Sequence, residues 1–311
     1  MALYSIGKLI KEIRKRRHFS QTQLGGGVYD AAAISRIESG KKIPSFSILR
    51  KILQGLGLNV TALNFFISEA EFKREQVAIE IRTSVAERNY DITDLLYKYE
   101  HCTKETMSSV ERQFYLLFTG IKQVEMEKAS PETVLPLYEK ALKLTLSDFS
   151  LTGHVTSTLL SLEELLLLNN IALEEWKIPS MQERAIKRLY FLKDYFERNA
   201  IDPVEKVHQY PIVLANLANF EEDMQNFQKE LELAEQGISF CCKYGNTNGL
   251  CSLILNKGVA LGYLKRHEEA KKYLRQALAM KVARGVDVSI YQKNILNALG
   301  YDFSDFLSQI M

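Results

Sequence analysis

Residues 34–45 read ISRIESGKKIPS. A helix is predicted over residues 31–39, since Asp30 is a favourable N-cap residue and Gly40 is a favourable C-terminal stop. A further helix is predicted to start near Ser45, directly after a proline. The segment therefore predicts two short helices joined by a tight, lysine-rich turn.

The segments before and after this run also predict short helices. A first helix is predicted over residues 5–18, where apolar residues recur on one stripe. Ser20 is the expected N-cap of a second helix, which three glycines at residues 25–27 end early because each costs about 1 kcal/mol relative to alanine. The inward side of the fourth helix is formed by Ile48, Leu49, Ile52, Leu53 and Leu56. Short helix, tight turn and short helix in one compact unit is the helix-turn-helix arrangement.

Residues 5–66 resemble the Xre or lambda-repressor-like DNA-binding domain. The resemblance rests on SQTQL at residues 20–24 and on the ISRIESG run. In that family an arginine of the first helix pairs with the glutamate that ends the recognition helix, and these positions correspond to Arg14 and Glu38. The resemblance implies that this pair is structural and locks helix one across helix three. Leu24 and Ile34 stand eleven and one residues before Ser35. This spacing is one residue tighter than in the commonest version of the domain and is similar to that of PlcR-type and Rgg-type regulators.

The charge distribution separates this region from the rest of the chain. The 311 residues, enough for about two domains, carry a net charge of only +2. Residues 1–60 hold eleven Lys and Arg against three acidic residues, which leaves 29 basic and 35 acidic residues after position 60. The basic N-terminal region, termed the head, is followed by an acidic remainder of the chain, termed the body. This charge separation favours a nucleic-acid partner for the head alone.

The body shows a weak repeat. Apolar or small residues recur at offsets of 4 and 7 in five places, which begin at Leu95, Val134, Ala185, Phe227 and Ala270. Successive starts lie 39, 51, 42 and 43 residues apart, which is longer than the ~34 residues of a tetratricopeptide repeat. In the last repeat Gly258 precedes Ala270 by twelve residues. This offset resembles a tetratricopeptide repeat, in which small residues let the two helices of a hairpin approach closely. We therefore predict a superhelix of five degenerate, tetratricopeptide-like hairpins, with residues 291–311 as a cap.

The resulting architecture is an all-α chain with three parts: a helix-turn-helix domain at residues 1–66, a linker helix at 67–88, expected to be exposed, and a peptide-binding and dimerisation domain at 89–311. This arrangement resembles the Rgg, PlcR and PrgX group of peptide-responsive regulators of Gram-positive bacteria. The resemblance implies a cytoplasmic homodimer that binds double-stranded DNA and a short signalling peptide.

Candidate DNA contacts follow from the resemblance and from the need for positive charge along the phosphates. Gln21 and Gln23 start helix two, where the family touches the backbone and flanking bases. Lys41, Lys42 and Ser45 lie in the turn after helix three and can reach phosphates, or the lysines simply form a solvated turn.

The base-facing positions on helix three are, by family analogy, Ala31, Ala32, Ser35 and Arg36. Alanines can contact thymine methyl groups but cannot form bidentate hydrogen bonds. Specificity is therefore expected to depend on Ser35, Arg36 and DNA shape. The alternative is that the alanines only start the helix and touch no base.

Candidate peptide contacts are asparagines on the first helices of the hairpins. An extended peptide needs partners for its backbone, and an Asn side chain offers a donor and an acceptor together. The candidates are Asn169, Asn170, Asn216, Asn219 and Asn256, with Phe220 and Tyr263 as possible apolar pockets. Asn256 resembles an Asn that binds peptide backbone in PlcR-like proteins. The alternative is that these residues fill polar gaps between helices.

Other classes of site find little support. Four cysteines without a CxxC pair indicate neither a disulfide framework nor zinc, and no histidine pair has ligand spacing. No cofactor and no catalytic group is expected, and no apolar run approaches the ~18 residues of a membrane span. The acidic residues Glu163, Glu164, Glu174, Glu175 and Glu221 to Asp223 are expected on solvated helix faces.

The function that follows is a DNA-binding transcriptional regulator switched by a short intracellular peptide. One alternative is a phage- or plasmid-type repressor with the same head and no peptide ligand. A peptide-controlled phosphatase would resemble the body, but such proteins lack the Xre head, so the ISRIESG run argues against it.

Overall fold

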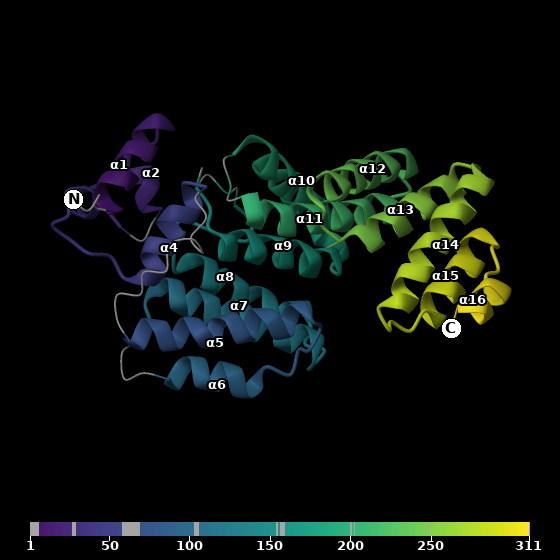
Figure 1. The fold of residues 1–311 in the computed structure, drawn as a ribbon, viewed down its shortest axis with the longest axis horizontal. Helices are drawn as coiled ribbons and strands as arrows, with labels where there is room; N and C mark the ends of the chain where they lie inside the picture. The colour runs from purple at the N-terminus through teal and green to yellow at the C-terminus, as the bar shows by residue number, and fades with distance from the viewer. Residues whose placement is uncertain are drawn as a thin grey trace. The chain divides into compact units, whose positions relative to one another are not determined.

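The computed structural model describes residues 6–26, 29–57, 69–102, 106–153, 155, 159–199, 201, 203–247 and 249–310. Every regular element in these ranges is helical (Figure 1), which confirms the predicted all-α class. None of these helices is long and apolar enough to cross a membrane. The chain divides into two compact units, residues 1–188 with 198–203 and residues 189–197 with 204–311. The predicted boundary between residues 66 and 67 lies outside the described ranges.

The described part of the head, within residues 6–57, forms four short helices. They are α1 (Ile6–Arg16), α2 (Gln21–Gly25), α3 (Ala31–Glu38) and α4 (Phe46–Gly55). The predicted caps are confirmed: Ser20 Oγ accepts a hydrogen bond from the Gln23 backbone N–H at 3.1 Å, and Asp30 Oδ1 accepts one from Ala33 at 2.6 Å. Gly26 ends α2 at φ +51°, a left-handed conformation that glycine adopts without strain.

The head core is built from the apolar stripes of α1, α3 and α4. Ile10, Ile34, Leu53 and Leu56 are completely buried in it. α1 crosses α3 so closely that a Cβ on Gly7 would lie 2.1 Å from the carbonyl oxygen of Ile37. The close crossing brings the polar side of α1 to the end of α3.

Five further helices complete most of the first unit. They are α5 (Glu69–Ala86), α6 (Thr93–His101), α7 (Ser109–Glu125), α8 (Pro131–Lys143) and α9 (Leu162–Trp176). The exposure expected of residues 67–88 holds for only one side of α5, since Arg74, Ala78 and Ile81 are buried. After a 3-10 turn at Pro179–Met181, α10 (Gln182–Arg198) contributes residues to both units.

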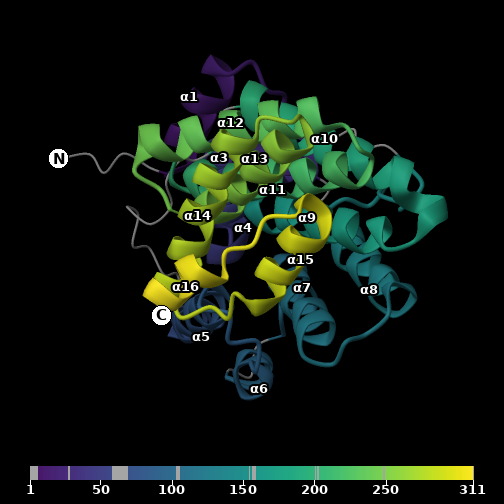
Figure 2. The same cartoon turned by 90° about the vertical axis from the view of Figure 1, so that its right-hand side faces the viewer.

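The second unit contains the remaining described helices. Its helices are α11 (Pro203–Asp223), α12 (Phe227–Tyr244), α13 (Leu250–Tyr263), α14 (His267–Ala283), α15 (Ser289–Leu299) and α16 (Ser304–Ile310). The five predicted repeat segments fall on α6, α8, α10, α12 and α14. α16 lies against α14 (Figure 2) and α15 packs against α13, and these helices share one apolar core.

The predicted close approach of small residues is visible between α13 and α14. A Cβ on Gly258 would lie 2.8 Å from the Leu274 side chain and 3.0 Å from its backbone nitrogen. Gly120 of α7 is approached in the same way by Tyr138 of α8. In both pairs the absent side chain lets the two helices pack together.

Candidate functional site

One face of α3 is open to solvent. Ala32, Ser35 and Arg36 are exposed and Ala31 is half-buried, while Ile34 and Ile37 face the core. Exposed positions three and four residues apart lie on one side of a helix. The four residues expected to face bases therefore share an accessible surface.

An ion pair fixes α1 against the end of α3. Arg14 Nη2 donates to Glu38 Oε2 at 3.0 Å, and Gln21 Nε2 donates to the same oxygen at 2.8 Å. Burial raises the pKa of Glu38, but the hydrogen bonds from Arg14 and Gln21 and the charge of Arg14 outweigh it and lower the pKa overall. The predicted Arg14 and Glu38 pair is thus present, and it has a third member in Gln21.

The other expected DNA contacts lie at the surface with local partners. Gln23 completes the capping box of α2, because its Oε1 accepts from the Ser20 backbone at 2.8 Å. The Lys42 ammonium sits 4.0 Å from the centre of the Tyr29 ring. Ser45 precedes α4, and its hydroxyl lies 3.2 Å from that of Ser47. Lys41 is exposed.

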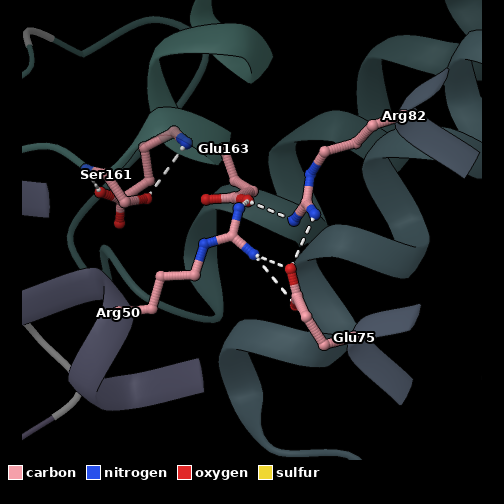
Figure 3. Close-up of polar contacts among 6 residues, drawn as sticks. Arg50, Glu75, Arg82, Ser161 and Glu163 are labelled. Atoms are coloured by element: carbon pink, nitrogen blue, oxygen red, sulfur yellow. Dashed lines mark hydrogen bonds and ion pairs between the residues drawn. The ribbon is translucent and has the colours of Figure 1, made fainter. Parts of the chain in front are cut away.

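A charged cluster joins α4 of the head to α5 and α9 (Figure 3). Arg50 donates to Glu75 Oε1 at 2.9 Å and to Glu163 Oε1 at 3.2 Å. Arg82 bridges the same two carboxylates at 3.1 and 3.2 Å. Burial raises the pKa of Glu163, but the charges of Arg50 and Arg82 outweigh it and keep the pKa below the ordinary value.

A second ion pair lies beside these four residues. Lys51 donates to Glu164 Oε1, and both side chains are almost fully buried. Thr145 Oγ1 also donates to Glu164 Oε1, at 2.5 Å, and the Ser161 backbone N–H donates to Oε2 at 2.7 Å. The docking cluster is the set Arg50, Lys51, Glu75, Arg82, Glu163 and Glu164.

The expectation of solvated acidic faces is therefore wrong for α9. Its four glutamates are no more than 5% exposed, and they are paired with basic residues. The residues are Glu163, Glu164, Glu174 and Glu175. Glu221 of α11 is also buried and accepts a hydrogen bond from Tyr190. One local signal was available, because Ser161 followed by Glu164 is a capping box.

Two of the candidate peptide residues lie on α9. Asn169 is 8% exposed. Asn170 is half-buried, and its Nδ2 donates to the Leu166 carbonyl at 2.8 Å. Both lie on the helix that carries Glu163 and Glu164 at its first turn.

The other candidates lie in the second unit, on α11 and α13. Asn219 is exposed, and its Oδ1 accepts a hydrogen bond from Asn256 Nδ2 at 2.8 Å. Asn256 is only 3% exposed and also donates to the Ala215 carbonyl at 3.2 Å. Asn256 thus bridges two helices. Asn216, which lies one turn before Asn219 on α11, is half-buried.

The two aromatic candidates differ in exposure. Phe220 is 4% exposed, so it belongs to the interior of the second unit. Tyr263 is half-buried and stacks on Phe227, with ring centres 4.1 Å apart. Only Tyr263 therefore offers ring surface to the outside.

One buried acid was not singled out from the sequence. Glu230 of α12 is fully buried, and neither of its oxygens has a hydrogen-bond partner among the described residues. Burial, together with the charges of Glu222 and Asp223, raises its pKa to about 9. The side chain is therefore a neutral acid at pH 7. The described ranges contain no group of His, Cys, Asp and Glu residues able to hold a metal ion.

Comparison with known proteins identifies the head and the fold. The helix-turn-helix family model matches residues 10–63. No curated protein sequence matches the chain. The structure of Bacillus thuringiensis PlcR in its apo form is 20% identical, with a TM-score of 0.56, and covers 94% of this chain and 98% of that one.

Two further solved structures match over a similar length. PlcR in complex with the peptide PapR7 and DNA is 19% identical, with a TM-score of 0.54, and covers 91% of this chain and 99% of that one. The apo form of the competence regulator ComR from Streptococcus vestibularis is 14% identical, with a TM-score of 0.46, and covers 91% of this chain and 99% of that one. The chain thus carries an N-terminal helix-turn-helix DNA-binding domain of the Xre type, and its all-helical fold is that of PlcR.

Proposed function

We propose that this protein is a transcriptional regulator that binds a near-palindromic promoter site as a homodimer and is switched by a short signalling peptide. The observation that carries the proposal is the exposed face of α3, on a helix-turn-helix domain joined to a body with the fold of PlcR. The solved PlcR complex contains both a peptide and DNA.

The DNA part is supported by the surface of the head. Arg36 and Ser35 are exposed on α3, and Lys41 follows in the next turn. A guanidinium can bond guanine in the major groove, while a lysine ammonium binds phosphate. A single helix-turn-helix head touches few bases, so two heads on two half-sites are expected.

The peptide part is supported by the asparagines. Asn219 is exposed, and its side-chain oxygen is oriented by a hydrogen bond from Asn256. An oriented amide can pair with both the N–H and the C=O of an extended peptide. In the first unit, α9 carries Asn169 and Asn170 together with the two acids that contact the head, Glu163 and Glu164. A peptide held by α9 would therefore act on a helix that also contacts the head.

The test uses the full chain and two probes. A pool of random-sequence duplexes, selected by binding, should yield a two-half-site consensus. A pool of short synthetic peptides should yield members that change the affinity for that consensus, because a ligand acts as a switch only if it binds two conformations differently.

Two variants separate the parts of the proposal. Arg36→Ala should weaken DNA binding and leave peptide binding intact, whereas Asn219→Ala should do the reverse. Unchanged DNA affinity with every peptide in the pool would favour a repressor without a peptide ligand. Failure to select any DNA would overturn the proposal as a whole.

A further inference from the structure

Two of the basic residues that make the head positive do not face solvent. The Arg50 side chain is 14% exposed and that of Lys51 is 7% exposed, although both belong to the DNA-binding domain. Arg50 contacts one carboxylate of α5 and one of α9, and Lys51 contacts a carboxylate of α9. By charge alone they would be assigned to phosphate contacts, yet here each already has an acidic partner.

The docking cluster is internally satisfied. Glu163 and Glu75 each pair with two arginines. Glu164 accepts hydrogen bonds from Lys51, from Thr145 and from the backbone N–H of Ser161, the N-cap of its own helix. A buried ion pair gives little net stability, because removing charges from water costs about as much as their attraction returns. A fully satisfied polar network does favour one arrangement, since any displacement leaves a buried charge without its partner.

Apolar and hydroxyl contacts lie around the same charges. Leu159 and Val110 belong to the apolar core of the head, and a Cβ on Gly55 would be 3.6 Å from that of Leu159. Ser47 Oγ lies 3.0 Å from Ser108 Oγ at the start of α7. The contact thus uses α4, while the outer face of α3 remains exposed. It fixes the head without covering the surface that would read bases.

We propose that Arg50 and Lys51 are positioning residues for DNA binding, which hold α4 in one orientation on α5 and α9 and so set the half-site spacing that a dimer accepts. This inference rests on the proposed two-headed function. Half-site spacing is a geometric consequence of where the two heads are held. A head that can turn accepts several spacings, whereas a head fixed through α4 accepts one.

The test measures the affinity of the full-length protein for duplexes that carry one half-site or two half-sites at several spacings. The wild type should prefer one spacing by about tenfold, the ratio that 1.4 kcal/mol of orientation energy produces. Arg50→Gln with Lys51→Met should remove this preference and leave the affinity for a single half-site unchanged. Circular dichroism checks that the variant is folded.

A second variant removes any ambiguity about phosphate contacts. Glu163→Gln weakens the cluster from the side of α9 and deletes no positive charge from the head. It should flatten the spacing profile in the same way. Glu80→Gln, at an exposed position of α5, is the matched control and should keep the wild-type profile. Lys41→Ala should lower the affinity at every spacing equally.

The outcomes are distinct. A spacing profile unchanged in both cluster variants would overturn the positioning role. An equal loss on single and paired half-sites with Arg50→Gln and Lys51→Met, with no effect of Glu163→Gln, would identify the two residues as phosphate contacts instead. A wild-type protein with no spacing preference would also overturn the positioning role, whereas a wild-type protein that binds two half-sites no more tightly than one would contradict the two-headed function itself.

Discussion

The guanidinium of Arg14 on α1 and the carboxylate of Glu38 at the end of α3 form a buried pair, with Nη2 3.0 Å from Oε2. Arg14 Nη1 also donates to the Phe19 carbonyl at 2.8 Å. One side chain therefore connects α1, the turn before α2 and the last turn of α3. The orientation of α3 relative to α1 depends on this connection.

Replacing Arg14 by Met should destabilise the head by about 3 kcal/mol, because it leaves the Glu38 carboxylate buried with only Gln21 as a partner. Replacing both partners by apolar residues should cost less than the sum of the single changes, since no buried charge remains. Urea unfolding of the full chain at pH 7 measures both. Additive effects would contradict a direct pair.

The same pair predicts a loss of stability in acid. The pKa of Glu38 is lower in the folded chain than its ordinary value of 4.5. The contribution of Glu38 is thus present above about pH 4.5 and disappears as the pH falls through the folded pKa. Arg14→Met should therefore be less sensitive to acid than the wild type between pH 5 and 3.

Features held by partners close in the sequence were predictable, whereas features held by distant partners were not. The caps at Ser20 and Asp30 were predictable because their partners lie three residues away. Burial of Glu163 was not, because its partners Arg50 and Arg82 lie 113 and 81 residues away. A charged side chain predicts solvent exposure unless its partner is known. The isolation of Glu230 likewise depends on packing that no local pattern encodes.

Gly258 should be intolerant of any side chain. A Cβ there would lie 2.8 Å from Leu274, so Gly258→Ala should force α13 and α14 apart at a cost of about 1–3 kcal/mol. Gly25→Ala is the matched control, because the nearest atom to its Cβ would be at 3.5 Å. That variant should be neutral or more stable by up to about 1 kcal/mol. Thermal unfolding distinguishes the two.

Glu230→Gln should stabilise the protein at neutral and alkaline pH. Between about pH 4.5 and 9 the carboxyl is ionised in the unfolded chain and protonated in the folded chain, so stability falls as the pH rises through this window, by at most about 1.4 kcal/mol per unit. Glutamine keeps the shape and does not titrate. Urea unfolding at pH 6, 7 and 8 should show a gain that grows with pH.

Glu232→Gln, at an exposed position of the same helix, supplies the comparison for this effect. It should leave the pH dependence unchanged. A gain for Glu230→Gln that stays constant from pH 6 to 8 would indicate a pKa outside this window.

Substitutions of Arg36 and of Lys41 should remove different kinds of DNA contact. Arg36→Ala should cost about 1–3 kcal/mol on the preferred site and relax the preference at one base pair. Lys41→Ala should weaken all sequences alike and reduce the salt dependence by about one phosphate contact. Binding isotherms at several salt concentrations separate them. Equal loss of specificity in both would contradict the base-facing position of Arg36.

Asn219 and Asn256 should separate ligand binding from packing. Asn256 is buried between α11 and α13, so Asn256→Ala should lower the free energy of unfolding by about 1–3 kcal/mol, because it leaves the Ala215 carbonyl and Asn219 without their donor. Asn219 is exposed, so Asn219→Ala should leave stability nearly unchanged and weaken peptide binding. Titration of a selected synthetic peptide, together with urea unfolding, measures both quantities. If Asn219→Ala binds the peptide as the wild type does, these two asparagines only pack one helix against another, as the alternative interpretation of the sequence holds.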